Sequence, residues 1–227
     1  MKFFNPKSTT LIAALSMCAV LISSCKKDPE PTPVVYGDAK ISVTNTVTGS
    51  NAQDFYQNDT KISTAAVAYG ETSGLYVVKA GNSTISFKDA GTTTVKATLP
   101  VGLETDISYT GFYYVDPAGS FKITGFGNDN VPPAIGKYKV RFVNLGSQLT
   151  NPLRAGINGG NALISELGFG NATAYFTVEV GSPVEIAVLN TTKVTAIPTA
   201  TFLSGKIYTV WVNGKDFTAD YHVIQHN

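Results

Sequence analysis

The sequence has few of the residues on which most enzyme chemistry depends. Only two cysteines occur, Cys18 and Cys25, both near the start, and the two histidines, His222 and His226, lie within six residues of the end. A zinc site needs three or four ligands, and nucleophilic catalysis needs an activated side chain beside a base. The sequence also contains no Walker loop and no Gly-Xaa-Ser-Xaa-Gly turn. We therefore predict that the protein is not an enzyme and uses neither a cofactor nor a metal ion.

Charge is also scarce, and it is evenly balanced. Charged residues make up 15% of the chain, with 17 Lys and Arg against 16 Asp and Glu. Nucleic-acid binding needs a basic patch that neutralises phosphates, whereas the densest cationic pair expected in the folded part is Lys139 with Arg141. We therefore expect no nucleic-acid partner.

Short runs of Val, Ile, Thr, Tyr and Phe, separated by Gly and Asn, fill the chain from Asp38 onward. These residues favour strands, and no helical period of useful length interrupts them. The fold class predicted is therefore all-β. The strands expected in the first half are Lys40–Asn45, Asp54–Gln57, Leu75–Ala80, Thr84–Lys88, Thr94–Leu99, Asp106–Val115 and Phe121–Gly125.

The first 25 residues have the pattern of an export signal. Two lysines precede the mostly apolar run Leu11–Ile22, which is shorter than the about 20 residues that span a bilayer. The run ends in Ser23-Ser24-Cys25, which resembles the lipobox of bacterial lipoproteins. The resemblance implies that residues 1–24 are a signal peptide, that the bond between Ser24 and Cys25 is cut, and that Cys25 carries the lipid. The alternative is a soluble secreted protein with an incidental Cys near its cleavage site.

A tether follows at residues 25–37. Lys26–Tyr36 contains three Pro, and at about 3.1 Å per residue such a segment could hold the fold roughly 30 Å from the lipid. The Cys-Lys-Lys-Asp start with a Pro-rich stretch resembles many Bacteroidota lipoproteins. Because Lys26 rather than Asp directly follows Cys25, the analogy with enterobacterial sorting favours the outer membrane, and the sequence leaves open whether the protein lies on its periplasmic or its extracellular face.

The folded region contains an internal repeat. Tyr138–Asn144 corresponds to Ala39–Asn45, and Thr105–Phe112 aligns with Gly205–Val212, which places Ile107 over Ile207. Segments that recur in the same order at a spacing of 99 to 100 residues indicate a duplicated unit. The further pairs, each 100 residues apart, are Tyr69-Gly70 with Phe169-Gly170, Tyr76 with Phe176, and Gly81 with Gly181.

Each repeat has about seven strands in roughly 90 residues, which fits an immunoglobulin-like sandwich. We predict two tandem immunoglobulin-like β-sandwich domains, at residues 38–127 and 137–227. The linker between them, residues 128–136, contains Pro132-Pro133, where neither a strand ladder nor a helix continues.

Several of these segments resemble the domain-of-unknown-function 4397 family. Lys139–Asn144 is similar to the "VRVVNAS" opening of that family, and Phe169-Gly170, Gly181 and Lys206–Val210 follow in the family's order. The first repeat is more divergent, because Asp106–Thr110 blurs the "YTV" element. The resemblance implies tandem β-sandwich domains of exported bacterial proteins, and it supplies no activity or site residues.

Two pairs of residues were weighed as chemical sites. Glu104 and Asp106 would point to one face of a strand, as an acid/base pair needs, but a solvated strand start after Gly102 is the better explanation. His222 and His226 would share one face of a helix, but Ala219–Ile224 alternates like a strand. We expect neither pair to be functional.

Asn128-Asp129-Asn130, followed by Pro132, is similar to the interdomain calcium linker of cadherins. Oxygen ligands suit Ca²⁺, but Phe126 replaces the first Asp of that motif and its partner motifs are missing. The sequence leaves calcium binding undecided.

Exposed aromatic side chains are the remaining candidates for ligand binding. Tyr113 and Tyr114 point to opposite faces of one strand, and Trp211 alternates with Val210 in another. Such rings stack on sugars or anchor a protein partner. The alternative places Tyr113, Tyr114 and Trp211 in a core or between the domains.

Together these features predict an outer-membrane lipoprotein, attached to the membrane by its N-terminal lipid, that is a binding or adhesion module for a glycan or protein. A structural or accessory subunit of an envelope complex is the alternative. A hydrolase that uses Glu104 and Asp106 is less favoured.

Overall fold

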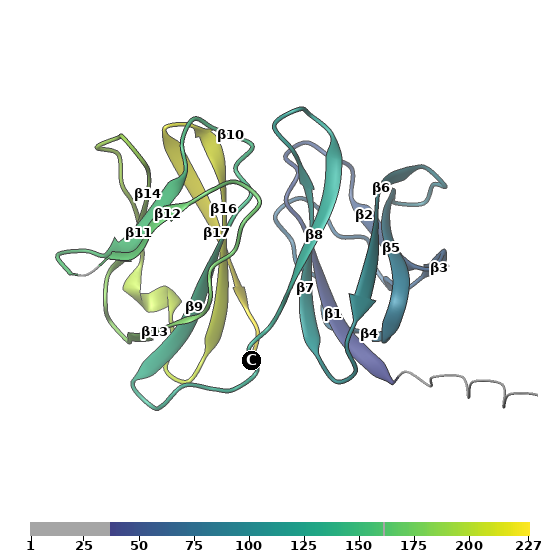
Figure 1. The fold of residues 1–227 in the computed structure, drawn as a ribbon, viewed down its shortest axis with the longest axis horizontal. Helices are drawn as coiled ribbons and strands as arrows, with labels where there is room; N and C mark the ends of the chain where they lie inside the picture. The colour runs from purple at the N-terminus through teal and green to yellow at the C-terminus, as the bar shows by residue number, and fades with distance from the viewer. Residues whose placement is uncertain (1–36, 161) are drawn as a thin grey trace, which may run out of the picture. The chain divides into compact units, whose positions relative to one another are not determined.

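Every regular element except one 3-10 turn, η1 (Thr199–Thr201), is a β-strand in the computed structural model, which describes residues 37–160 and 162–227. The expected signal peptide, the lipidated Cys25 and the tether up to residue 36 lie outside these residues. The described part belongs to one compact unit, Tyr36–Asn227, whose sheets form successive layers (Figure 1). No helix in the described ranges is long and apolar enough to cross a membrane.

The first half forms two sheets. Their orders are β4-β1-β7-β8 and β3-β2-β5-β6. All seven predicted strands are present with ends within four residues of the predicted ones, and only the two-residue β3 was missed. The bounds are β1 (Asp38–Asn45), β2 (Gln53–Gln57), β3 (Thr60–Lys61), β4 (Tyr76–Lys79), β5 (Gly81–Asp89), β6 (Val95–Leu103), β7 (Ser108–Val115) and β8 (Phe121–Gly127).

The second half repeats this arrangement. One sheet has the order β10-β16-β9-β13, with β17 also paired to β16, and the other has the order β12-β11-β14-β15. The bounds are β9 (Lys137–Asn144), β10 (Gln148–Leu149), β11 (Leu153–Ile157), β12 (Ala162–Leu167), β13 (Phe176–Glu179), β14 (Val184–Val188), β15 (Thr195–Ile197), β16 (Ile207–Asp216) and β17 (Thr218–Gln225).

The repeat extends to individual hydrogen bonds. Gly70 donates its N–H to the Asn45 carbonyl at 2.9 Å, and Gly170 donates to Asn144 at 2.7 Å. The φ values of the two glycines are 81° and 78°, a left-handed conformation that glycine adopts without steric cost. The spacing of 100 between these two positions therefore reflects the same turn built twice.

The spacing changes to 99 in the last strands of each half. Lys40 on β1 pairs with Ser108 on β7, and Lys139 on β9 pairs with Ile207 on β16, so Ser108 corresponds to Ile207. The predicted alignment of Ile107 with Ile207 is therefore wrong by one residue. The short β15 and the turn η1 replace the nine-residue β6 in the second half, and this connection is one residue shorter.

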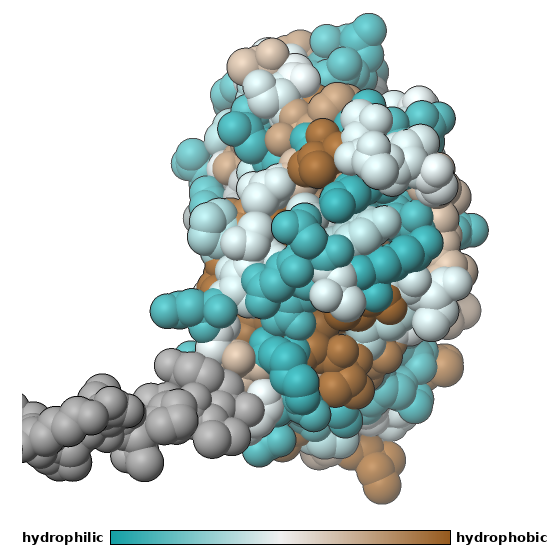
Figure 2. Space-filling model, turned by 90° about the vertical axis from the view of Figure 1, so that its right-hand side faces the viewer, coloured by the Kyte–Doolittle hydropathy of each residue, from teal (hydrophilic) through white to brown (hydrophobic). Residues whose placement is uncertain are grey.

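Each half has its own apolar core between its two sheets. The first core includes Phe55, Phe87 and Tyr113, and the second includes Tyr138, Phe142 and Tyr208. The sheet β3-β2-β5-β6 turns its other face to water, and Figure 2 shows a band of hydrophilic side chains across that face.

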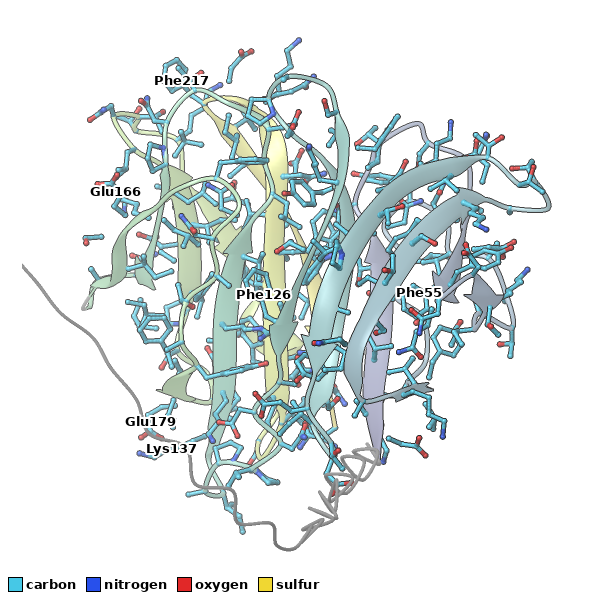
Figure 3. The ribbon with its side chains drawn as sticks, turned by 45° about the vertical axis from the view of Figure 1, so that its right-hand side comes forward. Phe55, Phe126, Lys137, Glu166, Glu179 and Phe217 are labelled. Carbon is cyan, nitrogen blue, oxygen red and sulfur yellow. The ribbon has the colours of Figure 1, made fainter. Side chains whose placement is uncertain are left out.

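The sheets that contain β1 and β9 are buried on both faces, because they also pack against each other. We call them the inner sheets. The side chains between them form the inter-sheet cluster, which consists of Phe112, Val143, Leu145, Trp211 and Ile224. Phe126 packs against this cluster and lies between the two halves (Figure 3). β8 ends at Gly127 and β9 begins at Lys137, while the two separate domains expected at 38–127 and 137–227 stay a prediction.

Candidate ligand-binding cleft between the two halves

The inter-sheet cluster joins the two halves through aromatic packing. Trp211 is fully buried, and its ring stacks on the His222 ring with centroids 3.8 Å apart and planes inclined by 2°. Burial lowers the pKa of His222, which favours the neutral ring. The equivalent position in the first half is Phe112, which is also fully buried and packs on Phe126. An aromatic ring from each half thus fills the space between the inner sheets.

Arg141 is the polar centre of the same layer. Its side chain is 2% exposed and donates three hydrogen bonds, from Nε to Thr209 Oγ1 at 2.8 Å, from Nη1 to the Gly127 carbonyl at 2.7 Å, and from Nη2 to Asn128 Oδ1 at 2.7 Å. No ion pair within the described residues involves Arg141, and burial lowers its pKa. Gly127 is the last residue of β8 and Asn128 follows it. Arg141 therefore links β9 to the first half of the unit.

Tyr69 makes a second link. Its hydroxyl accepts a hydrogen bond from Asn213 Nδ2 at 2.9 Å, and its ring meets His222 edge-on with centroids 5.9 Å apart. Tyr69 is 36% exposed, so part of the ring remains open to solvent. Asn213 lies opposite Asp220 in the β16–β17 hairpin, which places both side chains on the face that Trp211 and His222 share.

A cleft of about 490 Å³ opens beside Tyr69 and takes residues from both halves. It lies where β1, β7, β9 and β16 end, and we call it the end cleft. Val115 and Leu145 provide an apolar part of its lining. Its polar lining includes Tyr69, Gln148, Asn213, Lys215 and Asp220.

The polar groups of the end cleft suit a ligand rich in hydroxyl groups. Asn213 Oδ1 is buried and has no hydrogen-bond partner among the described residues, so it is an unsatisfied acceptor in the wall of the cleft. Asp220 offers further acceptors, Gln148 and Lys215 offer donors, and the open part of Tyr69 offers an apolar surface. Sugars and polar peptide segments both have the matching groups.

The comparison with protein families identifies the chain. Residues 39–151 match the model of the family described as Domain of unknown function (DUF4397). The chain belongs to this family. The match covers the half that we expected to be more divergent, and it also takes in β9 and β10 of the second half. The motifs Phe169-Gly170, Gly181 and Lys206–Val210 lie beyond it.

Other comparisons add little about the DUF4397 chain. No curated protein matches it significantly. The carbohydrate-binding module CBMbc (family CBM26) of Eubacterium rectale Amy13K, solved with maltoheptaose, is 15% identical, with 82% of this chain and 96% of that chain covered and a TM-score of 0.25. A putative cell adhesion protein of Bacteroides uniformis is 11% identical, with coverages of 84% and 97% and a TM-score of 0.24. Similarities this low support no inference about the ligand.

The aromatic residues proposed from the sequence do not form a binding site in the DUF4397 chain. Tyr113 and Trp211 are fully buried, which corrects their assignment as ligand-binding side chains. Tyr113 belongs to the core of the first half, where its ring stacks on Phe87 with centroids 5.3 Å apart. Tyr114 is half-buried and meets Phe169 edge-on across the two halves. Tyr113, Tyr114 and Trp211 therefore fit the alternative interpretation, which placed them in a core or between the domains.

The two carboxylates weighed as an acid/base pair do not share a strand face. Glu104 and Asp106 lie in the turn between β6 and β7 rather than on one strand face, and both are exposed. Asp106 has a φ of 64°, and its N–H donates to the Asp38 carbonyl at 2.9 Å. A turn directs the two carboxylates differently from a strand, so the geometry expected for acid/base catalysis is not formed.

The oxygens of the Asn128-Asp129-Asn130 segment are largely engaged by protein donors. Asn128 Oδ1 accepts from Arg141 and from Thr110 Oγ1, and Asp129 pairs with Lys139 at 2.5 Å. These two oxygen-bearing side chains therefore already have a cationic partner each. Across residues 37–160 and 162–227, no group of three or more His, Cys, Asp or Glu is placed to hold a metal ion.

His226 is fixed by the same polar layer as Arg141. Its Nε2 lies 2.7 Å from Thr209 Oγ1, which also accepts a hydrogen bond from Arg141 Nε, and the tautomer of the imidazole decides which of the two groups donates. Burial and the nearby Arg141 lower the pKa of His226 to about 4. His226 is therefore neutral at pH 7, and it lies beyond the end of β17 rather than on a helix with His222.

Three other clefts have similar volumes. One of about 470 Å³ lies along residues 64–76, one of about 460 Å³ lies beside His226, and one of about 370 Å³ lies on the outer sheet of the first half near Thr84 and Thr98. Among these four clefts of the described residues, the end cleft stands out because its lining includes a buried, unpartnered oxygen, Asn213 Oδ1.

Sequence reasoning missed the end cleft. The one signal available was Tyr69, which carries a hydroxyl where the repeat has Phe169. The other polar residues come from β10, β16 and β17, and only the packing of the inner sheets brings them beside Tyr69. That packing could not be derived from the pattern of one strand.

Proposed function

We propose that this DUF4397 chain is a lipid-anchored protein of the outer membrane, without enzymatic activity, that binds a glycan or protein at the cell envelope through the end cleft. The observation that carries this proposal is the unpartnered, buried Asn213 Oδ1 in a cleft built by both halves. A volume of about 490 Å³ lies within the range of small-molecule sites.

A glycan is the first ligand to test. Asp220, Gln148 and Lys215 line the cleft, and no ion pair within the described residues involves them, so their polar groups are available to hydroxyls. The partly exposed Tyr69 ring supplies the apolar face that sugar rings stack on. A polar loop of a protein partner would use the same groups.

The anchor and the domain type are parts of the same proposal. Cleavage between Ser24 and Cys25 and lipidation of Cys25 would fix the protein to the outer membrane. Tyr109 and Tyr208 support two immunoglobulin-like domains, because each hydroxyl accepts an N–H from five residues upstream, at 3.0 and 2.9 Å. This arrangement corresponds to the tyrosine corner of immunoglobulin domains.

The binding test uses the full-length protein, purified in detergent, on an array of bacterial, plant and host oligosaccharides. The variant Gln148→Ala/Asp220→Ala removes two polar groups of the cleft and leaves the inter-sheet cluster intact. The matched control is Thr84→Ala/Thr98→Ala, which alters the cleft on the outer sheet. We expect the control to keep every interaction of the wild type and the first variant to lose them.

The location is tested separately. Intact cells are treated with a protease that does not enter them, and the fate of residues 38–227 is followed by immunoblot. Digestion would place the binding unit on the cell surface. Protection until lysis would place it in the periplasm and would overturn the surface-adhesion version of the proposal.

A further inference from the structure

Three exposed aliphatic side chains gather at the end of the unit opposite the end cleft. Ile135 is 96% exposed, Leu203 is 54% exposed and Val180 is 42% exposed. We call them the lower patch. They sit on three turns that hydrogen bonds hold together, since Gly136 N–H donates to Ser204 Oγ at 2.8 Å and Val180 N–H donates to the Gly136 carbonyl at 2.8 Å.

The chain enters the folded unit at the same end. The lining of the end cleft includes residues that follow β1 and β9. The first residues of these strands, Asp38 and Lys137, therefore lie at the opposite end of the folded unit. Figure 1 shows both strands starting at the lower edge, and Figure 3 shows Lys137 and Glu179 there. Residue 37, where the tether joins the folded unit, therefore lies at the same end of the unit as the lower patch.

We propose that the lower patch rests on the membrane and inserts Ile135, Leu203 and Val180 into the lipid interface. This inference depends on the proposed lipid on Cys25. Eleven residues separate Cys25 from Gly37, and a chain of that length spans at most about 40 Å. A short tether holds its cargo at an effective concentration of about a millimolar, so even a weak contact would be occupied.

The charges near the lower patch indicate whether the membrane contact depends on anionic headgroups or on aliphatic insertion. Lys137 and Glu179 pair with each other at 2.9 Å beside the patch, and Lys206 is the remaining charge on these turns. One lysine gives little attraction to anionic headgroups. The contact should therefore depend on aliphatic insertion rather than on headgroup charge. It would also leave the end cleft facing away from the membrane.

The test measures the depth of a spin label in vesicles. The full-length protein with Ile135→Cys is lipidated in cells, labelled with a nitroxide and reconstituted into phosphatidylethanolamine and phosphatidylglycerol vesicles (3:1). The matched control is Thr93→Cys, an exposed position on the β5–β6 turn at the other end. We expect the ratio of oxygen to nickel-chelate collisions to be about tenfold higher at residue 135 than at residue 93, as for an interfacial side chain.

The outcomes separate this inference from the anchor. Flotation with the vesicles together with a water-exposed label at residue 135 would overturn the lower patch and leave the anchor standing. Failure to float would overturn both. Broadening of the nitroxide spectrum by the label of a second copy would show that another copy covers the lower patch. This result would also overturn the proposal.

A second variant checks that the patch itself causes the contact. With Val180→Cys as the labelled site, the added changes Ile135→Asp and Leu203→Asp should lower the collision ratio about tenfold, because charged groups leave the interface. Both replaced side chains are exposed, so the fold should tolerate the changes. An unchanged ratio would contradict the proposal, and so would a ratio that requires anionic lipid.

Discussion

Arg141 and its neighbours show how single residues join the two halves. The guanidinium is buried without a carboxylate among the described residues, and its donors are satisfied by a hydroxyl, a carbonyl and an amide oxygen. The sequence marked Lys139 and Arg141 only as a cationic pair. It could not indicate that Arg141 is buried, because its partners Gly127 and Asn128 were assigned to the end of one domain and to a linker.

We predict that Arg141→Lys lowers the free energy of unfolding by about 2–4 kcal/mol. Lysine cannot reproduce the planar fork of three hydrogen bonds and leaves buried acceptors unpaired. Urea denaturation at pH 7 measures the change. Arg154→Lys, on the partly exposed β11, is the control and should change stability by less than about 1 kcal/mol. Equal effects of the two substitutions would contradict the role given to Arg141.

His226 should make stability depend on pH between about 6.5 and 4. Its pKa is lowered from 6.5 to about 4 in the folded protein, so below pH 6.5 the unfolded state binds more protons. Stability is therefore full above pH 6.5 and falls as the pH falls toward 4. The loss should be about 1–3 kcal/mol, since one pKa unit is 1.36 kcal/mol and the group is partly exposed.

The measurement compares thermal unfolding of the wild type and His226→Gln across this pH range. The variant should lose most of the dependence, because glutamine accepts a hydrogen bond but does not titrate. His222 is present in both proteins. The lowered pKa values of Asp54, Asp89 and Asp129 also reduce stability below about pH 5, but these residues are present in both proteins and cancel in the comparison. Identical curves would show that His226 does not carry the effect.

At the scale of elements, the sequence predicts the positions of the strands but not which faces of the strands are buried. Alternation placed the seven strands of the first half, but it left open which of Val210 and Trp211 is buried. Both are buried, because β16 lies in an inner sheet with Val210 in the core of the second half and Trp211 in the inter-sheet cluster. A strand covered on both faces loses the alternation by which exposure is predicted.

The tyrosine pair gives a prediction about these elements. Tyr109→Phe and Tyr208→Phe should each lower stability by about 1 kcal/mol, because each removes the acceptor of one backbone N–H at the start of β7 or β16. Urea denaturation is the measurement. Tyr221→Phe is the matched control, since the hydroxyl of Tyr221 has no side-chain hydrogen bond in the described structure, and it should change little. A cost at only one of the two positions would contradict the equivalence of the halves.

At the scale of the whole molecule, the inter-sheet cluster makes two repeats into one unit. The repeat could be predicted from spacing, but the contact between the inner sheets could not, because no single segment encodes it. The same contact creates the end cleft. The binding site that we propose is therefore a property of the joined halves rather than of either repeat.

We predict a single unfolding transition in calorimetry, with both halves unfolding together. Trp211→Ala should lower the free energy of unfolding by about 3–5 kcal/mol, because it removes a fully buried ring from the inter-sheet cluster. Two separate transitions in the wild type would show that the halves are independent.

Ligand binding at the end cleft is the central claim, and one titration tests it most directly. An oligosaccharide selected on the array is titrated into the full-length protein by calorimetry, alongside the Gln148→Ala/Asp220→Ala and Thr84→Ala/Thr98→Ala variants. We predict that the first variant weakens binding at least about tenfold, since hydrogen bonds to charged groups contribute about 1.5–3 kcal/mol, and that the second binds like the wild type. Equal affinities in all three proteins would place the ligand elsewhere and contradict the account.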